Sequence, residues 1–287
     1  MKQQNTKTVC KESSLRSIAS SLHKNFVLKP ALKLFRPRST PAFWTMPYDT
    51  ICREILLNGF YEKDLLKGMC ALVKDKQTTV LDVGANIGNH SIYFSQNFKN
   101  VVAFEPVQRN CWIFKANLHL NRISNVDLIE VALSNSNGEL VCAHYDANDT
   151  NMVLHKSNEA PLLGSDIVQA SVGDEQLAQR EESTPISLIK IDVEGHEPEV
   201  IQGLRSTIME HKPLIVWEAF TRDSVSESRV LLEAMGYKYF YHLTTRRYGI
   251  KWFDKLVNAF ERAVYVVPLD LCETYDGMNI ASPDKIS

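Results

Sequence analysis

Four acidic residues stand at the ends of short apolar runs in this sequence of 287 residues. Asp82 lies near the end of one run, Glu105 follows the next, and Asp192 and Glu218 follow two later runs. If these runs are parallel strands, the four carboxylates meet at the edge where open α/β sheets bind ligands. Carboxylates there can accept hydrogen bonds from hydroxyl groups or balance a cationic ligand. The pattern therefore predicts a ligand-binding crevice at this edge.

A glycine-containing turn follows the first of these runs, in the stretch from Val80 to Gly88. Gly84 and Gly88 can adopt strained backbone angles and let a ligand approach the main chain. The dinucleotide fingerprint G-x-G-x-x-G is not met, because Asn86 stands where its second glycine would be. Asp82 would lie unfavourably beside a pyrophosphate, whereas it suits a ligand that carries an ammonium and a sulfonium group. The turn therefore favours S-adenosylmethionine over NAD.

Glu105 lies 21 residues after Gly84, at the predicted end of the next strand. A carboxylate in this position can accept hydrogen bonds from ribose hydroxyls, as it does in dinucleotide sites. Together with the preceding turn, Glu105 predicts that the crevice binds a nucleoside.

The run of residues 188–197 delivers several ionisable side chains into one short loop. We interpret His196 as the first candidate for a general base that takes the proton of a hydroxyl acceptor, because imidazole ionises near neutral pH. Asp192 and Glu194 are the alternatives, either as proton acceptors or by orienting the acceptor. Asp192 and Glu218 could instead hold Mg²⁺ through oxygen ligands, a minor alternative to a site without metal.

Alternating apolar strands and amphipathic helices carry these residues. This alternation predicts right-handed βαβ crossovers and a mostly parallel sheet that is buried on both faces. We expect strands at residues 78–83, 101–104, 126–131, 187–191, 214–217, 237–242 and 263–267, and helices at residues 63–74, 88–97, 108–121, 197–211 and 225–235. The fold class is therefore α/β, a Rossmann-like sheet with helices on both faces. His90, on the helix after Gly88, is expected to be structural.

Composition argues against several other classes of protein. Hydrophobic residues make up 44% of the chain and charged residues 23%, as in ordinary soluble globular proteins. No run of about 18 apolar residues and no apolar N-terminal leader is found, so we expect a cytoplasmic protein. The six cysteines show no C-x-x-C spacing, which argues against a zinc cluster and against a disulfide framework.

Charge is distributed unevenly along the chain. Residues 1–40 contain nine Lys or Arg and one acid, Glu12, whereas the whole chain has a net charge of −2. We expect residues 1–47 to form a basic N-terminal extension that is partly disordered or helical. Peripheral contact of this extension with an anionic membrane is the functional alternative, and no specific nucleic-acid partner is expected.

Residues 48–287 are expected to form the main domain, with a polar insertion near residues 134–186. In this insertion Asn137-Gly138 predicts a tight hairpin. The polar stretch of residues 146–165 is hard to assign, and long connections of this kind are typical of functional lids or disordered loops.

At these residues the sequence resembles the FkbM family of class I methyltransferases. Four blocks carry the resemblance, in family order and spacing across about residues 50–220: residues 81–88, 104–106, 131–134 and, most specifically, 189–197. The resemblance implies a seven-stranded sheet whose last strand runs antiparallel to its neighbours. It also implies that the turn from Asp82 to Gly88 holds S-adenosylmethionine, with Glu105 on the ribose, and that a hydroxyl group of a sugar, glycan or secondary metabolite is methylated.

Other functions stay open beside O-methylation. The chain could methylate a nitrogen of a small molecule, or it could be a catalytically silent Rossmann-like binding module. An NAD-dependent oxidoreductase is a further alternative, against which the missing glycine spacing speaks. The acceptor, a small molecule or a glycan, and the oligomeric state are left open by the sequence.

Overall fold

The computed structural model describes residues 41–45, 50–144, 152–155, 165–180, 184–219, 222–244, 265–269 and 277–286. Contacts divide the chain into two units, Met1–Pro41 and Ala42–Ser287, and the second unit is described below. The basic extension predicted for residues 1–47 therefore lies outside the described residues, apart from residues 41–45. Most of the polar stretch 146–165 lies outside them as well.

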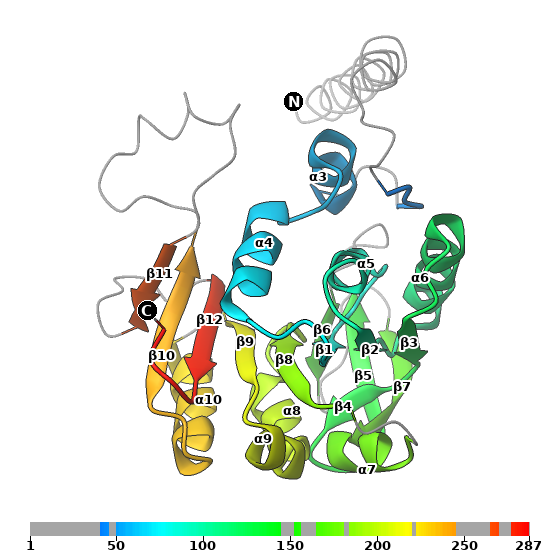
Figure 1. The fold of residues 1–287 in the computed structure, drawn as a ribbon. Coiled ribbons are helices and arrows are strands. Elements are labelled where there is room, and N and C mark those ends of the chain that lie inside the picture. Colours follow the sequence, from blue (N-terminus) through cyan, green and yellow to red (C-terminus); the bar gives the residue numbers. More distant parts are fainter. Residues whose placement is uncertain are drawn as a thin grey trace, which may run out of the picture. The chain divides into compact units, whose positions relative to one another are not determined.

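An eight-stranded sheet forms the centre of the second unit (Figure 1). Its strand order is β11-β10-β12-β9-β8-β1-β2-β3. The strands are β1 (Thr79–Val83), β2 (Asn100–Phe104), β3 (Val126–Ile129), β8 (Ile186–Ile191), β9 (Leu214–Ala219), β10 (Tyr239–Thr244), β11 (Tyr265–Pro268) and β12 (Gly277–Ser282). Strands β3, β2, β1, β8 and β9 are parallel, and β12 lies antiparallel between β9 and β10. The Rossmann-like α/β prediction and the antiparallel last strand are thus confirmed, and β11 adds an eighth strand at the edge.

The last strand along the chain, β12, was not predicted from the sequence. The segment Gly277–Ser282 contains Asn279 and Ser282, which interrupt its apolar pattern, yet both side chains are buried. The strand expected at residues 263–267 is instead the edge strand β11. Pairing with β9 and β10, rather than the hydrophobicity of the segment itself, therefore places β12 in the sheet.

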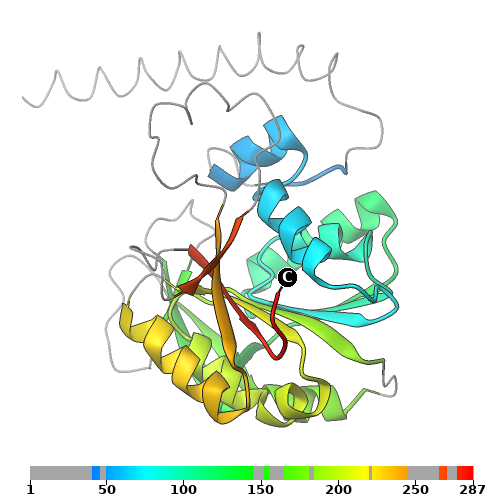
Figure 2. The same ribbon diagram turned by 60° about the vertical axis from the view of Figure 1, so that its left-hand side comes forward.

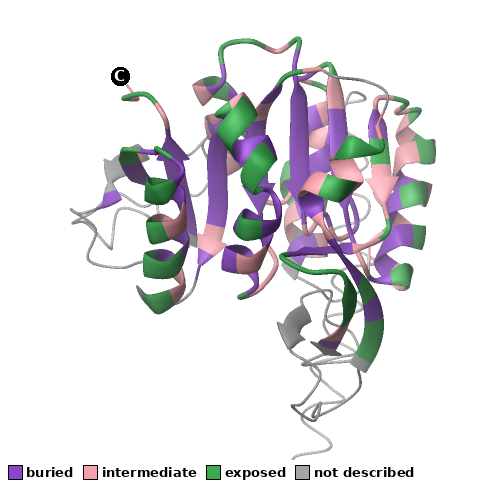
Figure 3. Cartoon of the chain, turned by 90° about the horizontal axis from the view of Figure 1, so that it is seen from below, coloured by how far each residue is buried: buried purple, intermediate pink, exposed green. Residues whose placement is uncertain are grey.

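Helices cover both faces of the sheet (Figures 1 and 2). Buried side chains of α4 (Lys63–Leu72), α5 (Asn89–Ser95) and α6 (Gln108–Asn121) pack into one core, and those of α8 (Glu197–Gly203), α9 (Arg205–His211) and α10 (Arg222–Ala234) pack into another. Figure 3 shows the central strands buried and the helices exposed on their outer sides. Within the part of the chain that the structure describes, no helix is long and apolar enough to cross a membrane.

The helix predicted for residues 197–211 is interrupted. It forms α8 and α9, which meet at Leu204. At Gly203, where α8 ends, a Cβ atom would lie 2.0 Å from the carbonyl oxygen of Ser134. The backbone of the strand containing Ser134 therefore packs directly against the end of α8.

A second, four-stranded sheet occupies the predicted polar insertion. It consists of β4 (Ala132–Ser134), β7 (Ser165–Val172), β5 (Gly138–His144) and β6 (Met152–His155), in that order. The tight hairpin predicted at Asn137-Gly138 is wrong: a strand, β5, does follow these residues, but it pairs with β7 and β6. The unpredicted strand β7 lies between β4 and β5 and pairs with both of them. Buried Cys142, Val168 and Ala170 pack with Val107 and Ala132, so this small sheet is joined to the loop that follows β2.

The segment of residues 42–45 is held along helix α6 by two asparagines one turn apart. Asn117 accepts a hydrogen bond from the backbone nitrogen of Trp44 (2.6 Å) and donates to its carbonyl oxygen (3.2 Å). Asn121 makes the same pair of contacts with Ala42 (2.9 and 2.7 Å). Asn117 also donates to the carbonyl oxygen of Ile87 (2.8 Å). The N-terminal segment and the turn after β1 are therefore fixed by one side chain.

Candidate active site

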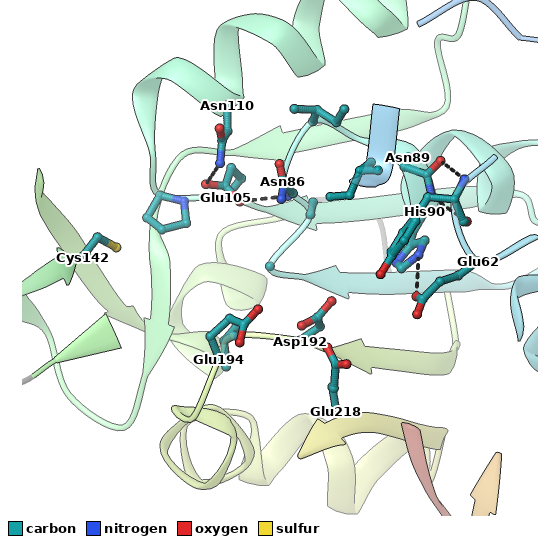
Figure 4. Close-up of a pocket in the computed structure, with 17 residues that line it drawn as sticks. Glu62, Asn86, Asn89, His90, Glu105, Asn110, Cys142, Asp192, Glu194 and Glu218 are labelled. Carbon is teal, nitrogen blue, oxygen red and sulfur yellow. Dashed lines mark hydrogen bonds and ion pairs between the residues drawn. The ribbon is translucent and has the colours of Figure 1, made fainter. Parts of the chain in front are cut away.

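A cavity of about 260 Å³ lies at the carboxyl ends of β1, β2, β8 and β9 (Figure 4). Its lining includes α3 (Thr50–Asn58) and the segment before α4, in addition to the strand ends. The lining residues are Ile51, Tyr61, Glu62, Gly84, Ala85, Asn86, Ile87, Asn89, His90, Glu105, Pro106, Asn110, Cys142, Asp192, Val193, Glu194 and Glu218. The structure thus brings the ends of four parallel strands to one cavity, as the acidic pattern predicts.

The turn between β1 and α5 has three residues with positive φ: Gly84 at 77°, Asn86 at 50° and Gly88 at 87°. A Cβ atom on Gly84 would lie 1.8 Å from the carbonyl oxygen of Asp192, and one on Gly88 would lie 2.1 Å from the ring of Phe114. Gly88 does not line the cavity. Contacts within the protein therefore already require both glycines, and of the two only Gly84 also lines the cavity, where a ligand could approach it as predicted.

Replacing Gly84 by alanine should lower the free energy of unfolding by about 3 kcal/mol, because the new methyl group meets the Asp192 backbone at a strained φ. Urea denaturation measures the change. Gly195→Ala is the matched control: its φ is 102°, but no atom lies within 4 Å of the added Cβ. It should cost only about 1–2 kcal/mol for the backbone conformation. Equal losses in the two variants would contradict the packing argument.

Glu105 is buried and its carboxylate faces the cavity. It accepts hydrogen bonds from the backbone nitrogens of Asn86 (2.8 Å) and Val107 (3.0 Å) and from the Asn110 side chain (3.3 Å). Burial raises the pKa of Glu105 to about 7, although these three hydrogen bonds oppose the shift. The Asn110 side-chain oxygen is buried and has no partner among the described atoms. The two side chains therefore present a fixed polar group at this end of the cavity.

Asp82 lies behind the cavity wall. Its side chain is 0% exposed and is absent from the lining. Ser91 donates a hydrogen bond of 2.6 Å to one carboxylate oxygen, and the Lys190 ammonium lies 3.2 Å from the other. The predicted direct contact of Asp82 with the amino-acid part of the ligand is therefore replaced by a contact with Lys190, because β1 is buried along its whole length.

Lys190 joins the β1–α5 turn to the loop after β8. Its buried ammonium donates to the carbonyl oxygen of Gly84 (3.0 Å) and lies 3.2 Å from Asp82 and 3.3 Å from Asp192. Burial opposes the charge, but the two carboxylates outweigh it and raise the pKa of Lys190. A charged lysine therefore holds these groups in place.

Asp192 and Glu218 line the cavity as a hydrogen-bonded pair of carboxyl groups. Burial alone would raise the pKa of Asp192, but the charge of Lys190 holds it below its usual value. Burial, followed by the negative charge of Asp192, raises the pKa of Glu218. At neutral pH the pair therefore contains an ionised Asp192 and a protonated Glu218.

The loop after β8 brings Glu194 into the lining with a φ of 55°. Glu197, the first residue of α8, supports this loop from behind. Its carboxylate accepts hydrogen bonds from the backbone nitrogens of Gly195 (3.0 Å) and Val193 (3.3 Å). The loop conformation that presents Glu194 is thus fixed by the start of the helix.

His196 does not reach the cavity. Its ring is buried, with Nε2 3.0 Å from the Ser134 hydroxyl and Nδ1 3.7 Å from the Glu199 carboxylate. The residue therefore links the start of α8 to β4. Of the three residues predicted to act on the acceptor proton, Asp192 and Glu194 line the cavity and His196 does not.

His90, expected to be structural, lines the cavity instead. Its Nε2 lies 3.4 Å from the Glu62 carboxylate, and its ring is stacked on Tyr61 at 6.3 Å between centroids. Sequence reasoning missed Tyr61 and Glu62 altogether, because they precede α4 and belong to no recognisable motif. Only the packing of this segment against α5 brings them to the site.

No metal centre is evident in the described part of the chain, where no group of three or more His, Cys, Asp and Glu side chains could hold an ion. The two residues considered for Mg²⁺, Asp192 and Glu218, are hydrogen-bonded to one another.

Known proteins resemble this chain over much of its length. A family model described as "Methyltransferase FkbM domain" matches residues 82–239, more than half of the chain. Methyltransferase 1 of Beauveria bassiana is 24% identical over 180 residues, which cover 55% of this chain and 71% of that protein. The hexuronic acid methyltransferase AglP of Haloferax volcanii is 30% identical over 160 residues, covering 56% of this chain and 64% of AglP, less than two thirds of that relative. The alignment with a solved structure, methyltransferase FkbM from Methylobacillus flagellatus KT, covers 91% of this chain and 60% of the chain in that structure, with 15% sequence identity and a TM-score of 0.47.

Proposed function

This chain belongs to the FkbM methyltransferase family, and on that basis we propose that it transfers the methyl group of S-adenosylmethionine to a hydroxyl group of a sugar, glycan or secondary metabolite. One observation carries the proposal: Glu105 faces the same cavity as Asp192, Glu194 and Glu218. In this proposal Glu105 binds the ribose and the other acids lie beside the reacting groups, on two sides of one space (Figure 4). A hexuronic acid methyltransferase among the relatives supports a glycan acceptor.

The residues present fit the methyl donor. Glu105, held by Asn86 and Asn110, would accept hydrogen bonds from the ribose hydroxyls. The acids across the cavity, Asp192 and Glu194, would balance the ammonium and sulfonium charges. The donor supplies an electrophilic methyl group, whose bond to sulfur breaks as the acceptor oxygen bonds to the methyl carbon.

The chain's own residues have to position the acceptor hydroxyl and remove its proton. Holding the oxygen in line with the methyl group can supply much of the acceleration. Asp192 would accept a hydrogen bond from the acceptor, and the protonated Glu218 would donate one. His90 would take the proton, because it lines the cavity and Glu62 lies beside its Nε2. His196 has no part in the proposed step, because it lies outside the lining and a base has to reach the proton it abstracts.

Mass spectrometry tests the proposal most directly. The purified protein is incubated with S-adenosylmethionine and a panel of sugars, glycans and small metabolites, with and without a chelator. We expect a mass gain of one methylene on a hydroxyl, unaffected by chelation. Methylation of nitrogen would indicate the alternative acceptor class. Donor binding without transfer would indicate a silent binding module, and failure to bind the donor would reject the proposal.

A further inference from the structure

An exposed apolar surface lies on α6 and on the segment of residues 42–45 that runs along this helix (Figure 1). Its large side chains are Trp112 and Leu120 of α6, which are 65% and 44% exposed, and Trp44, which is 64% exposed. Trp112 and Leu120 are eight positions apart, so they lie on one side of the helix about two turns from each other. Asn117 binds the backbone of Trp44 and is a helical neighbour of Leu120, so Trp44 lies next to Leu120. We call Trp44, Trp112 and Leu120 the tryptophan surface.

The area of the tryptophan surface argues against a stable contact between two copies of the chain. Its two tryptophans and one leucine expose about 350 Å² of apolar side chain, since a whole aromatic side chain accounts for 150–250 Å². A patch of this size on a monomer is often functional. An interface between two protein chains buries about 800 Å² on each partner, which is about twice as much. Tryptophan side chains also accumulate at the headgroup level of lipid bilayers, where the ring is partly buried and its N–H stays wet.

The charges near the tryptophan surface are positive. Helix α6 contains no Asp or Glu, and it exposes Lys115, which contacts Glu130, and His119. A larger positive charge lies directly before the surface in the sequence. Residues 1–40 contain nine Lys or Arg and one acid, whereas acids outnumber Lys and Arg in the rest of the chain. Residue 40 is four positions before Trp44, so at most about 14 Å of extended chain separates the two. The basic residues are therefore tethered beside the tryptophan surface, which fits a negatively charged partner.

We propose that the tryptophan surface docks on an anionic lipid bilayer. Residues 1–40 supply the electrostatic attraction to anionic headgroups, and the two tryptophans and Leu120 enter the headgroup region. One weak signal gives only marginal membrane binding, whereas an apolar and a basic signal together give stable attachment. Helix α6 also supplies Asn110 to the cavity lining, so docking brings the active site close to the bilayer. Docking itself does not require methyl transfer.

Co-sedimentation of the full chain with vesicles measures docking. Vesicles of phosphatidylcholine alone are compared with vesicles of phosphatidylcholine and phosphatidylglycerol, at low and high salt. We expect binding to the anionic vesicles that weakens at high salt, and little binding to phosphatidylcholine alone. The double variant Trp44→Ser/Trp112→Ser should bind the anionic vesicles about 100-fold more weakly, because each inserted tryptophan contributes about tenfold. The hydrogen bonds of Trp44 with Asn117 use main-chain atoms and are retained in this variant.

The double variant Ile167→Ser/Val230→Ser is the matched control. It removes two side chains, 69% and 63% exposed, from β7 and α10, and should leave vesicle binding unchanged. Tryptophan fluorescence provides a second readout that needs no variant to fold. Emission of the wild-type protein should shift to shorter wavelength on anionic vesicles, because tryptophan side chains leave water.

Several outcomes would overturn the inference. These are absence of binding or of the fluorescence shift in the wild-type protein, and equal losses of binding in the two double variants. Unchanged binding of Trp44→Ser/Trp112→Ser would assign docking to the basic residues alone and would also overturn it. So would light scattering that shows a dimer lost in this variant, without vesicle binding by the wild-type protein, because the partner would then be a second copy.

Discussion

Replacing Glu105 by glutamine should weaken the binding of S-adenosylmethionine by about 100-fold or more at pH 8. Each hydrogen bond from a ribose hydroxyl to an ionised carboxylate is worth about 1.5–3 kcal/mol, and two such bonds are lost or weakened. Calorimetric titration of the donor measures the change. Glu130→Gln is the control, because this exposed acid contacts Lys115 and Gln108 outside the cavity. Similar donor affinities in the two variants would remove Glu105 from the ribose site.

The same residue should make donor binding depend on pH. Because burial raises the pKa of Glu105 to about 7, the ligand-free protein holds a proton there under mildly acidic conditions. The donor requires the ionised form, so its dissociation constant should rise about tenfold for each pH unit below 7. The stability of the ligand-free protein should depend on pH in the opposite sense. Between pH 4.5 and about 7 the native state holds a proton on Glu105 that the unfolded state has released, so the contribution of Glu105 to the free energy of unfolding falls as pH rises.

In Glu105→Gln the dependence of donor affinity on pH through 7 should disappear. Thermal unfolding checks that this variant remains folded, because glutamine presents an amide where the Asn86 and Val107 backbone nitrogens now donate. A pH dependence retained by the variant would mean that another group takes up the proton.

The sequence predicted which strands would meet at the cavity, but not which way each side chain would point. Glu105 directly follows β2, and its placement in the cavity follows from the parallel order of the sheet. Asp82 lies within β1, where a side chain can be enclosed by neighbouring layers, and its partner is Lys190, which stands opposite it in register on the adjacent strand β8. His196 belongs to the most specific sequence block, yet it contacts Ser134. Residues of one sequence motif can be expected to lie in the same loop, but the direction of each side chain depends on packing against segments that are distant in the sequence.

The parts of the fold that were missed depend on long-range pairing. In β7, exposed Asp166 and Gln169 are mixed with buried Val168 and Ala170, so the segment lacks the apolar run that marked the central strands. It is a strand because β5 and β4 flank it. Similarly, Glu62 reaches His90 only because the segment before α4 packs against α5. Neither contact leaves a local pattern in the sequence.

Replacing His90 by glutamine should lower kcat by about 100- to 10,000-fold, the usual contribution of a general base. Glutamine preserves much of the shape of the side chain but cannot take the hydroxyl proton. The effect on donor affinity should be small, because the ribose contact at Glu105 is retained. Steady-state rates with a methylated acceptor from the mass-spectrometric panel measure the change.

The comparison of kcat with donor affinity separates this role from a structural one. His90→Gln should lower kcat while the dissociation constant of the donor stays close to the wild-type value. His196→Gln is the matched histidine control. Losing the contacts with Ser134 and Glu199 should reduce its stability, but its kcat at a temperature where it is folded should stay near the wild-type value. If His90→Gln retained the wild-type kcat, the proton would have to go to another lining group, and Asp192 would be the next residue to test.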